Sequence, residues 1–324
     1  MSQILLTGKS YRNFIEAIHS PFSKLYYKNS LSLYMKWKKV GSCDILLSED
    51  PKTIQESIID YIIYLREERK IASTSISTNV AAIKKFYDCN DIELKWKKIK
   101  NYVGRNKTKR NNGKKDRPYT SMEILKMLEK ADERGRTIIL LMASTGIRVG
   151  ALPSLKIRNL QRIDGYDLYK ITVYENEDEE YITYCTPECA RAIDSYLEYR
   201  QRHGERPLKE NAPLIREEFD IHDEIRASRP RILEQQTFKK LIRNIGLRSG
   251  VIEKQALTEH GRGPHRPVKE THGFRKFFQT ALESYLRPSE NDLLEGNDKM
   301  IRYIGVMDAL TISNEFRLTR EVQT

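Results

Sequence analysis

The chain has 324 residues, enough to bury one large hydrophobic core or two cores of ordinary size. It carries 57 Lys and Arg against 45 Asp and Glu, so its formal net charge is +12. This excess favours a polyanionic partner such as nucleic acid, because each phosphate neutralised by Lys or Arg releases a condensed counterion. No apolar run is long enough to cross a bilayer, so the sequence argues against a membrane partner.

Cysteine usage and the start of the chain predict a reducing, cytoplasmic location. The first residues lack the basic stretch and sustained apolar segment of a secretory signal. Four cysteines are too few and too scattered for a disulfide framework. Cys185 and Cys189 stand four residues apart, but no nearby Cys or His pair completes a zinc site. We therefore expect ordinary thiols, no metal and no cofactor.

Residues 1–104 predict a small helical bundle without strands. Residues 51–70 and 75–89 carry apolar side chains at helical spacing. Before the first of these helices, Ser48, Glu49, Asp50 and Pro51 supply a cap, acids and a Pro in the first turn. The remaining faces are rich in Lys, which favours a surface that follows a phosphate backbone; ordinary solvated lysines are the alternative. These residues, with two accompanying Trp, are Lys36, Trp37, Lys38, Lys39, Lys84, Lys85, Lys95, Trp96, Lys97, Lys98 and Lys100.

Residues 105–117 predict a basic linker. They contain no large apolar side chain and so cannot join a core. Their charge suits a strap along a nucleic-acid backbone, and the alternative is a plain solvated connector. The candidate DNA-binding residues are Arg105, Lys107, Lys109, Arg110, Lys114 and Lys115.

Residues 118–324 are predicted to form a second domain. Thr120 and Glu123 predict a capping box at a helix start. The nearly apolar stretch 136–144 predicts a buried helix that leads to Arg148. An arginine at that place has its backbone fixed by the core and its guanidinium group directed outward.

A β-hairpin is predicted from residues 167–174 and 180–184, because both segments are rich in β-branched and aromatic residues. Its tip, residues 175–179, is acidic and would repel a phosphate unless other charges neutralised it. Beyond the hairpin, the pattern predicts helices over 186–202 and 236–247 and a loop over 258–269, with 211–230 unassigned.

Two motifs carry the chemistry. The first runs from Ser144 to Leu152 and contains Arg148; the second is His272-Gly273-Phe274-Arg275, followed ten positions later by Tyr285. Two guanidinium groups can hold the non-bridging oxygens of a phosphate, an imidazole can move a proton, and a phenol oxygen can attack phosphorus. The set suits phosphodiester chemistry without a metal.

These motifs resemble the catalytic domain of the tyrosine recombinases, or phage-type integrases, in particular the integrases of archaeal mobile elements. The helical first hundred residues are similar to the core-binding domain of that family. The resemblance implies a mainly α fold with a small β-hairpin or sheet. It divides the chain into a core-binding domain at 1–104, the basic linker at 105–117 and a catalytic domain at 118–324.

The resemblance also implies a function, that of a site-specific DNA recombinase or integrase. Such a protein encloses double-stranded DNA, associates with further copies on it and cleaves a strand through a 3′-phosphotyrosyl link, without a cofactor. By the same resemblance, Arg148 and Arg275 would hold the scissile phosphate and His272 would act as acid and base. Tyr285 would be the nucleophile.

The chain departs from the family pattern at three places. The hairpin tip is acidic where the family has a lysine, and no Gly-His pair separates Arg275 from Tyr285. If one helix joined these two residues, they would lie about 15 Å apart and about 80° out of line. Either the chain bends, or Tyr285 serves a neighbouring protomer, or a catalytic segment has been lost.

Two alternatives therefore remain open. Tyr303 is a competing nucleophile, because its distance from Arg275 is closer to the family's spacing, with Gly296 and Asn297 in place of the Gly-His pair. The competing function is that of a catalytically impaired relative that binds DNA without strand exchange.

Overall fold

The computed structural model describes residues 6–104, 116–253, 268–285 and 297–313. The chain divides into two compact units, residues Met1–Gly113 and Lys114–Thr324. Each unit has its own hydrophobic core. Within the described ranges, every helix is too short or too polar to span a membrane.

The first unit is helical, and its described residues contain no β-strand. Its elements are α1 (Lys9–Glu16), α2 (Pro21–Lys38), the 3-10 turn η1 (Asp44–Leu47), α3 (Pro51–Glu67), α4 (Ser73–Asp88) and α5 (Trp96–Tyr102). The Asp50 carboxylate caps α3 by accepting hydrogen bonds from the backbone N–H of Lys52 at 2.9 Å and of Thr53 at 3.2 Å. The predicted helix start is thus confirmed.

The second unit combines helices with one small sheet. Its elements are α6 (Ser121–Glu129), α7 (Glu133–Thr145), the 3-10 turns η2 (Leu152–Ser154) and η3 (Ile157–Asn159), β1 (Leu160–Ile163), β2 (Leu168–Val173), β3 (Tyr181–Tyr184), α8 (Pro187–Arg202), α9 (Glu224–Ser228), α10 (Gln235–Arg248), α11 (Glu270–Tyr285) and α12 (Asn297–Leu310). The capping box of Thr120 and Glu123 is present at the start of α6. The mainly helical fold with a small sheet agrees with the prediction.

The sheet is antiparallel in the order β1-β2-β3. The predicted hairpin is its β2-β3 half, in which Val173 is opposite Tyr181. The strand β1, in which Leu160 is opposite Ile171, was not predicted. Its four residues, two of them exposed and polar, are too few to produce a periodic signal.

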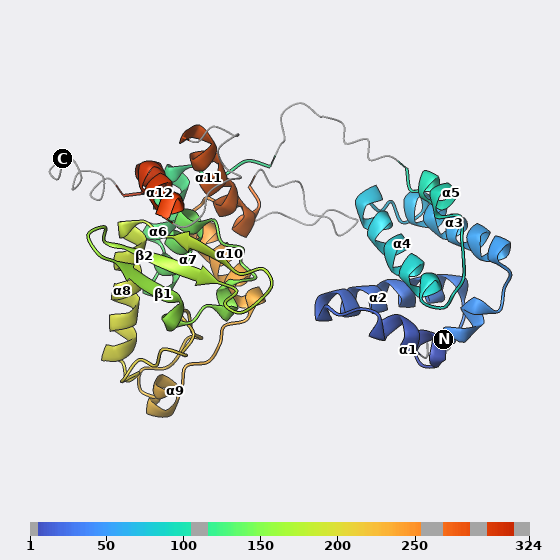
Figure 1. The fold of residues 1–324 in the computed structure, drawn as a ribbon, viewed down its shortest axis with the longest axis horizontal. Coiled ribbons are helices and arrows are strands. Elements are labelled where there is room, and N and C mark those ends of the chain that lie inside the picture. Colours follow the sequence, from blue (N-terminus) through green and yellow to red (C-terminus); the bar gives the residue numbers. More distant parts are fainter. Residues whose placement is uncertain (1–5, 105–115, 254–267, 286–296, 314–324) are drawn as a thin grey trace. The chain divides into compact units, whose positions relative to one another are not determined.

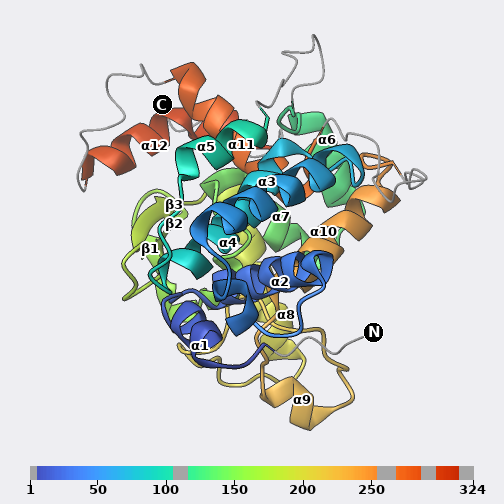
Figure 2. The same ribbon diagram turned by 90° about the vertical axis from the view of Figure 1, so that its right-hand side faces the viewer.

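Helix α7 is the centre of the second unit. Its residues 137–145 are buried, and it packs against α6, α8, α10, α11 and α12. Helices α11 and α12 lie side by side in both views (Figure 1, Figure 2). A helix segment that is apolar on every face has to be covered on every face. The buried helix predicted from the apolar run is thus confirmed.

A buried ion-pair cluster fixes the segment after α8. The Glu205 carboxylate accepts hydrogen bonds from Arg200 Nε at 2.9 Å and from Arg216 Nη1 at 2.6 Å. All three side chains are almost wholly buried. The same arginines donate to backbone carbonyls, Arg200 to that of Leu214 at 2.9 Å and Arg216 to that of Ala227 at 2.6 Å. One carboxylate therefore balances two guanidinium groups inside the protein.

Removing that carboxylate charge should destabilise the second unit. We expect Glu205→Gln to lower the free energy of unfolding by about 3 kcal/mol, because it leaves two buried guanidinium groups without a counter-charge. Urea denaturation at neutral pH measures the change. Glu198→Gln, on an exposed position of α8, is the matched control and should cost less than about 0.5 kcal/mol. Equal effects of the two variants would contradict the assigned role of Glu205.

Candidate active site

The site is organised around the turn that ends α7. The chain leaves the helix through Gly146, which has a left-handed backbone with φ of 62°. A Cβ atom at Gly146 would lie 2.3 Å from Cδ1 of Phe278 on α11. Glycine is therefore required twice at this position, for the backbone conformation and for the close approach of α11.

The last carbonyl groups of α7 accept hydrogen bonds from three other elements. A helix leaves its last carbonyls without intrahelical partners. Here the Ser144 carbonyl accepts a hydrogen bond from the Tyr303 hydroxyl at 2.7 Å, and that of Thr145 accepts from the Thr183 hydroxyl at 3.3 Å. The Gly146 carbonyl accepts from Nη1 of Arg275 at 2.7 Å. Residues of α12, β3 and α11 thus meet at one turn.

The two arginines of the sequence motifs come together at this turn. Arg148 is exposed and follows the buried Ile147, whereas Arg275 is half-buried and bonded to the Gly146 carbonyl. Both guanidinium groups act electrostatically on the same two phenols, those of Tyr174 and Tyr181. Burial raises the pKa of each phenol, and the two positive charges oppose that rise. Such a pair of guanidinium groups can bind the oxygens of a phosphate.

Tyr174 and Tyr181 are residues that the sequence analysis missed as part of the site. They stand at the base of the hairpin, on either side of the acidic tip, with ring centroids 6.3 Å apart. In the sequence they read as strand residues that pack against neighbours. Their position beside the acidic tip was the only available signal.

His272 lies exposed in the first turn of α11. Its helix is anchored by Asp116, which forms ion pairs with Lys269 at 3.2 Å and Lys276 at 3.3 Å. Burial raises the pKa of Asp116, but the two lysines outweigh it and hold the pKa below its usual value. The start of the second unit is thereby tied to α11 on both sides of His272.

The two candidate nucleophiles have different surroundings. Tyr285 is the last residue of α11, which runs without a break from Arg275. Tyr303 lies on α12 with 6% of its surface exposed, and its ring packs against Tyr184 with centroids 5.7 Å apart. The Tyr303 hydroxyl is therefore inside the core, bonded to the Ser144 carbonyl, and is not exposed to solvent.

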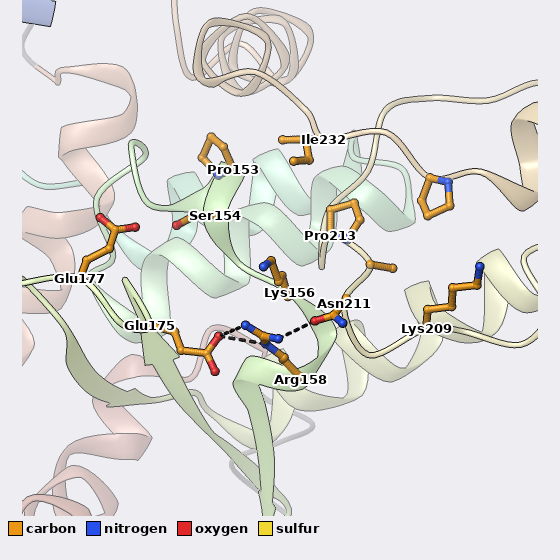
Figure 3. A pocket seen from close by; sticks show the side chains of 12 residues that line it. Pro153, Ser154, Lys156, Arg158, Glu175, Glu177, Lys209, Asn211, Pro213 and Ile232 are labelled. Atoms are coloured by element: carbon orange, nitrogen blue, oxygen red, sulfur yellow. Dashed lines mark hydrogen bonds and ion pairs between the residues drawn. The ribbon is translucent and has the colours of Figure 1, made fainter. Parts of the chain in front are cut away.

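The acidic hairpin tip is partly neutralised. Glu175 accepts hydrogen bonds from Arg158 Nε at 2.9 Å and Nη2 at 2.7 Å, and these bonds hold the pKa of Glu175 below its usual value. Arg158 also donates to the Asn211 side chain at 2.5 Å. Figure 3 shows this group at one side of a cavity of about 430 Å³. The cavity lining includes none of Arg148, His272 or Arg275.

The remaining sequence predictions concern other parts of the chain. The candidate DNA-binding residues Arg105, Lys107, Lys109, Arg110, Lys114 and Lys115 lie outside the described residues, as does most of the predicted loop 258–269. Cys185 and Cys189 are buried in the core of the second unit. Among the described residues, no three His, Cys, Asp or Glu side chains form a group that could hold a metal ion.

The turn at Gly146 gives a stability prediction. We expect Gly146→Ala to lower the free energy of unfolding by about 2 to 4 kcal/mol, as the sum of left-handed strain and overpacking against Phe278. Gly165→Ala is the control, because Gly165 also has a positive φ, of 81°, but has nothing within 4 Å of its Cβ position. It should lose only the strain component, about 1 kcal/mol, in the same urea titration. Equal losses would show that the contact with Phe278 contributes nothing.

Comparisons with known proteins identify the fold. No protein-family model and no curated protein sequence matches the chain. Among solved structures it is similar to the XerH site-specific recombinase bound to a palindromic difH substrate, with 17% identity, 91% of this chain and 75% of that chain covered, and a TM-score of 0.53. It is also similar to a lambda integrase dimer bound to a COC′ core site, with 16% identity, coverage of 84% and 83%, and a TM-score of 0.50.

The Tn1549 transposon integrase in complex with transposon right-end DNA is a third such structure. It is 13% identical, with 91% of this chain and 98% of that chain covered and a TM-score of 0.50. These likenesses extend over both units. The chain therefore has the fold of the tyrosine recombinases, with a helical first unit and a second unit built on helices and one small antiparallel sheet.

Proposed function

We propose that the chain is a site-specific DNA recombinase or integrase that cleaves and rejoins DNA through a 3′-phosphotyrosyl intermediate. One observation carries the proposal: guanidinium groups from two distant segments meet at the end of α7. Arg275 is bonded to Gly146, 129 residues away in the sequence, and Arg148 follows two positions later. Two guanidinium groups can hold the non-bridging oxygens of a phosphate, while the neighbouring phenols can act on its attacking or leaving oxygen.

In the proposed reaction, Arg148 and Arg275 bind the two non-bridging oxygens of the scissile phosphate. Negative charge builds on these oxygens when phosphorus becomes pentacoordinate, so fixed positive charge there lowers the barrier. His272, exposed at the start of the same helix as Arg275, accepts the proton of the attacking phenol. The phosphotyrosyl link conserves the energy of the broken bond, so rejoining needs no cofactor.

Double-stranded DNA is the proposed partner. The net charge of +12 supports it. So do the similar structures, in which XerH is bound to its difH substrate, lambda integrase to a core site and the Tn1549 integrase to transposon DNA. We propose that residues 1–104 and the basic linker contribute phosphate contacts. The lambda integrase is described as a dimer on its site, and we propose self-association on DNA for this chain. A cytoplasmic location is part of the same proposal.

The choice of nucleophile follows from helix geometry. Because α11 is continuous, ten residues place the Cα atoms of Arg275 and Tyr285 about 15 Å apart along the axis and about 80° apart around it. One chain can hardly bring both residues to one phosphate. We propose that Tyr285 attacks the phosphate held by the arginines of a neighbouring protomer.

The same geometry favours a second candidate function. The hydroxyl of Tyr303 donates its hydrogen bond inside the core, and Tyr285 is carried away from Arg275 by its helix. If neither phenol reaches a phosphate, the chain binds DNA at the arginine pair without strand exchange. It is then a catalytically impaired relative of the recombinases.

A suicide-substrate assay with mixed variants separates these functions. We expect the wild type to form a covalent adduct with a nicked duplex that carries its attachment site, seen on a denaturing gel. Tyr285→Phe and Arg275→Ala should each reduce the adduct at least about a hundredfold. A mixture of the two variants should restore it, because one supplies the phenol and the other supplies the arginines.

Tyr303→Phe is the control in this assay. It should keep the adduct and lose about 1 kcal/mol of stability, because its hydroxyl bonds the Ser144 carbonyl. An adduct that survives Tyr285→Phe but not Tyr303→Phe would reassign the nucleophile. A mixture that stays inactive while each parent chain binds DNA would contradict attack between protomers. Binding without any adduct from the wild type would favour the impaired relative.

DNA binding should depend steeply on salt. Many phosphate contacts release many counterions, so we expect the affinity to fall at least about a hundredfold between roughly 50 and 200 mM monovalent salt. Fluorescence anisotropy with a labelled duplex measures this. A variant with Gln at all six basic linker positions, 105, 107, 109, 110, 114 and 115, should have a smaller slope. A flat response of the wild type would contradict the nucleic-acid assignment.

A further inference from the structure

We propose that Tyr174 is a further catalytic residue, whose phenol donates a proton to the departing 5′ oxygen of the cleaved strand. This inference rests on the proposed recombinase function. An unprotonated alkoxide is a poor leaving group, because its conjugate acid, an alcohol, is about as weak an acid as water. Cleavage therefore requires a proton donor on the opposite side of phosphorus from the nucleophile.

Tyr174 stands at the right place. It directly follows β2, and its hydroxyl lies 4.0 Å from the position that a Cβ atom would take on Gly150. Gly150 belongs to the same turn as Arg148, which is two residues earlier. The hairpin is joined to that turn by the hydrogen bond from Thr183 to the Thr145 carbonyl. The phenol thus lies beside the turn that carries Arg148, and the charge of Arg148 acts on it.

The backbone of Tyr174 supports a positioned side chain. Its φ is 58°, in the left-handed region that bulky residues rarely adopt. The turn is closed by a hydrogen bond of 2.9 Å from the Glu177 N–H to the Tyr174 carbonyl. The ring meets that of Tyr181 at an interplanar angle of 63°. A residue stays in this backbone region where its surroundings fix it, as the turn and the ring contact do here.

The protonation state also fits an acid. Burial raises the pKa of Tyr174, and the carboxylates of Glu177 and Glu179 raise it further, so the phenol keeps its proton at neutral pH. Arg148 and Arg275 act in the opposite direction. These same charges would stabilise the phenolate that remains after the proton has left.

Other described groups near the turn suit the role less well. Arg158 holds the pKa of Glu175 low, so that carboxyl has no proton to give. Lys269 and Lys276 are ion-paired with Asp116. For Tyr181, Arg275 affects the pKa more than Arg148 does, whereas for Tyr174 the order is reversed.

The proposed step balances. The attacking phenol of the nucleophile gives its proton to His272 and forms a bond to phosphorus, while the bond from phosphorus to the 5′ oxygen breaks. The proton of Tyr174 moves to that oxygen, which leaves as a hydroxyl group. In rejoining, the Tyr174 phenolate takes the proton of the attacking 5′-hydroxyl, and protonated His272 returns its proton to the released phenol.

Sulfur substitution at the leaving atom tests the proposal. A duplex with sulfur in place of the bridging 5′ oxygen needs no donor, because a thiol is a far stronger acid than an alcohol. We expect Tyr174→Phe to cleave the ordinary duplex about a hundredfold more slowly than the wild type and the sulfur duplex at the wild-type rate. Tyr181→Phe, which removes a neighbouring phenol, should keep the wild-type ratio of the two rates.

Each other outcome has a clear meaning. Equal slowing of Tyr174→Phe on both duplexes, or no slowing on either, would overturn the role as proton donor. Sulfur rescue of Tyr181→Phe instead would move the role to that residue. A wild type that cleaves only the sulfur duplex would show that the chain has no donor, while leaving the recombinase chemistry intact. A wild type that cleaves neither duplex would refute the proposed function itself, and this inference with it.

Discussion

The backbone carbonyl groups at the end of α7, which have no partner within the helix, are the constraint on which the second unit depends. Every helix ends with such groups, and most meet water or a capping residue. Here residues 144–146 are bonded by Tyr303, Thr183 and Arg275, which come from α12, β3 and α11. The negative end of the helix dipole also favours the guanidinium group of Arg275. One helix end therefore sets the relative positions of the sheet, the arginine motif and the last described helix.

The positive charges of the second unit have two distinct uses. Arg200 and Arg216 are buried, share the carboxylate of Glu205 and hold the segment after α8 in place. Arg148 is exposed. Arg275 donates one hydrogen bond to the Gly146 carbonyl, and its charge also opposes the rise in the pKa of the hairpin phenols. The sequence motifs single out Arg148 and Arg275, but nothing in the sequence shows that Arg200 and Arg216 are buried. Burial and partners distinguish the two pairs. A buried guanidinium group needs a carboxylate beside it, whereas one that binds a ligand has to be accessible from solvent.

The hairpin shows how a departure from a family pattern can be accommodated. An acidic tip beside the arginines of the two motifs would repel a phosphate, but Arg158 forms an ion pair with Glu175 from the neighbouring turn. In the proposed reaction, the phenol of Tyr174 at the base of the tip donates the proton that the Glu175 carboxylate cannot supply. The continuous α11 has the opposite effect, because it moves Tyr285 away from the arginines of its own chain. The proposed proton donor and the proposed nucleophile thus lie on different elements, and each can be removed without the other.

Much of this protein was determined locally by its sequence. The capping box of Thr120 and Glu123, the cap of Asp50 and the apolar run of α7 each act within one turn or one helix, so the sequence predicts them directly. The motifs with Arg148 and Arg275 predicted a phosphate-binding pair, and this stays a prediction. The strand β1 and the positions of Tyr174 and Arg158 were missed, because short strands and single side chains acquire meaning only through distant partners. Tertiary structure alone decided that Arg275 bonds to Gly146 and that Tyr303 points into the core, since those contacts join residues more than a hundred positions apart.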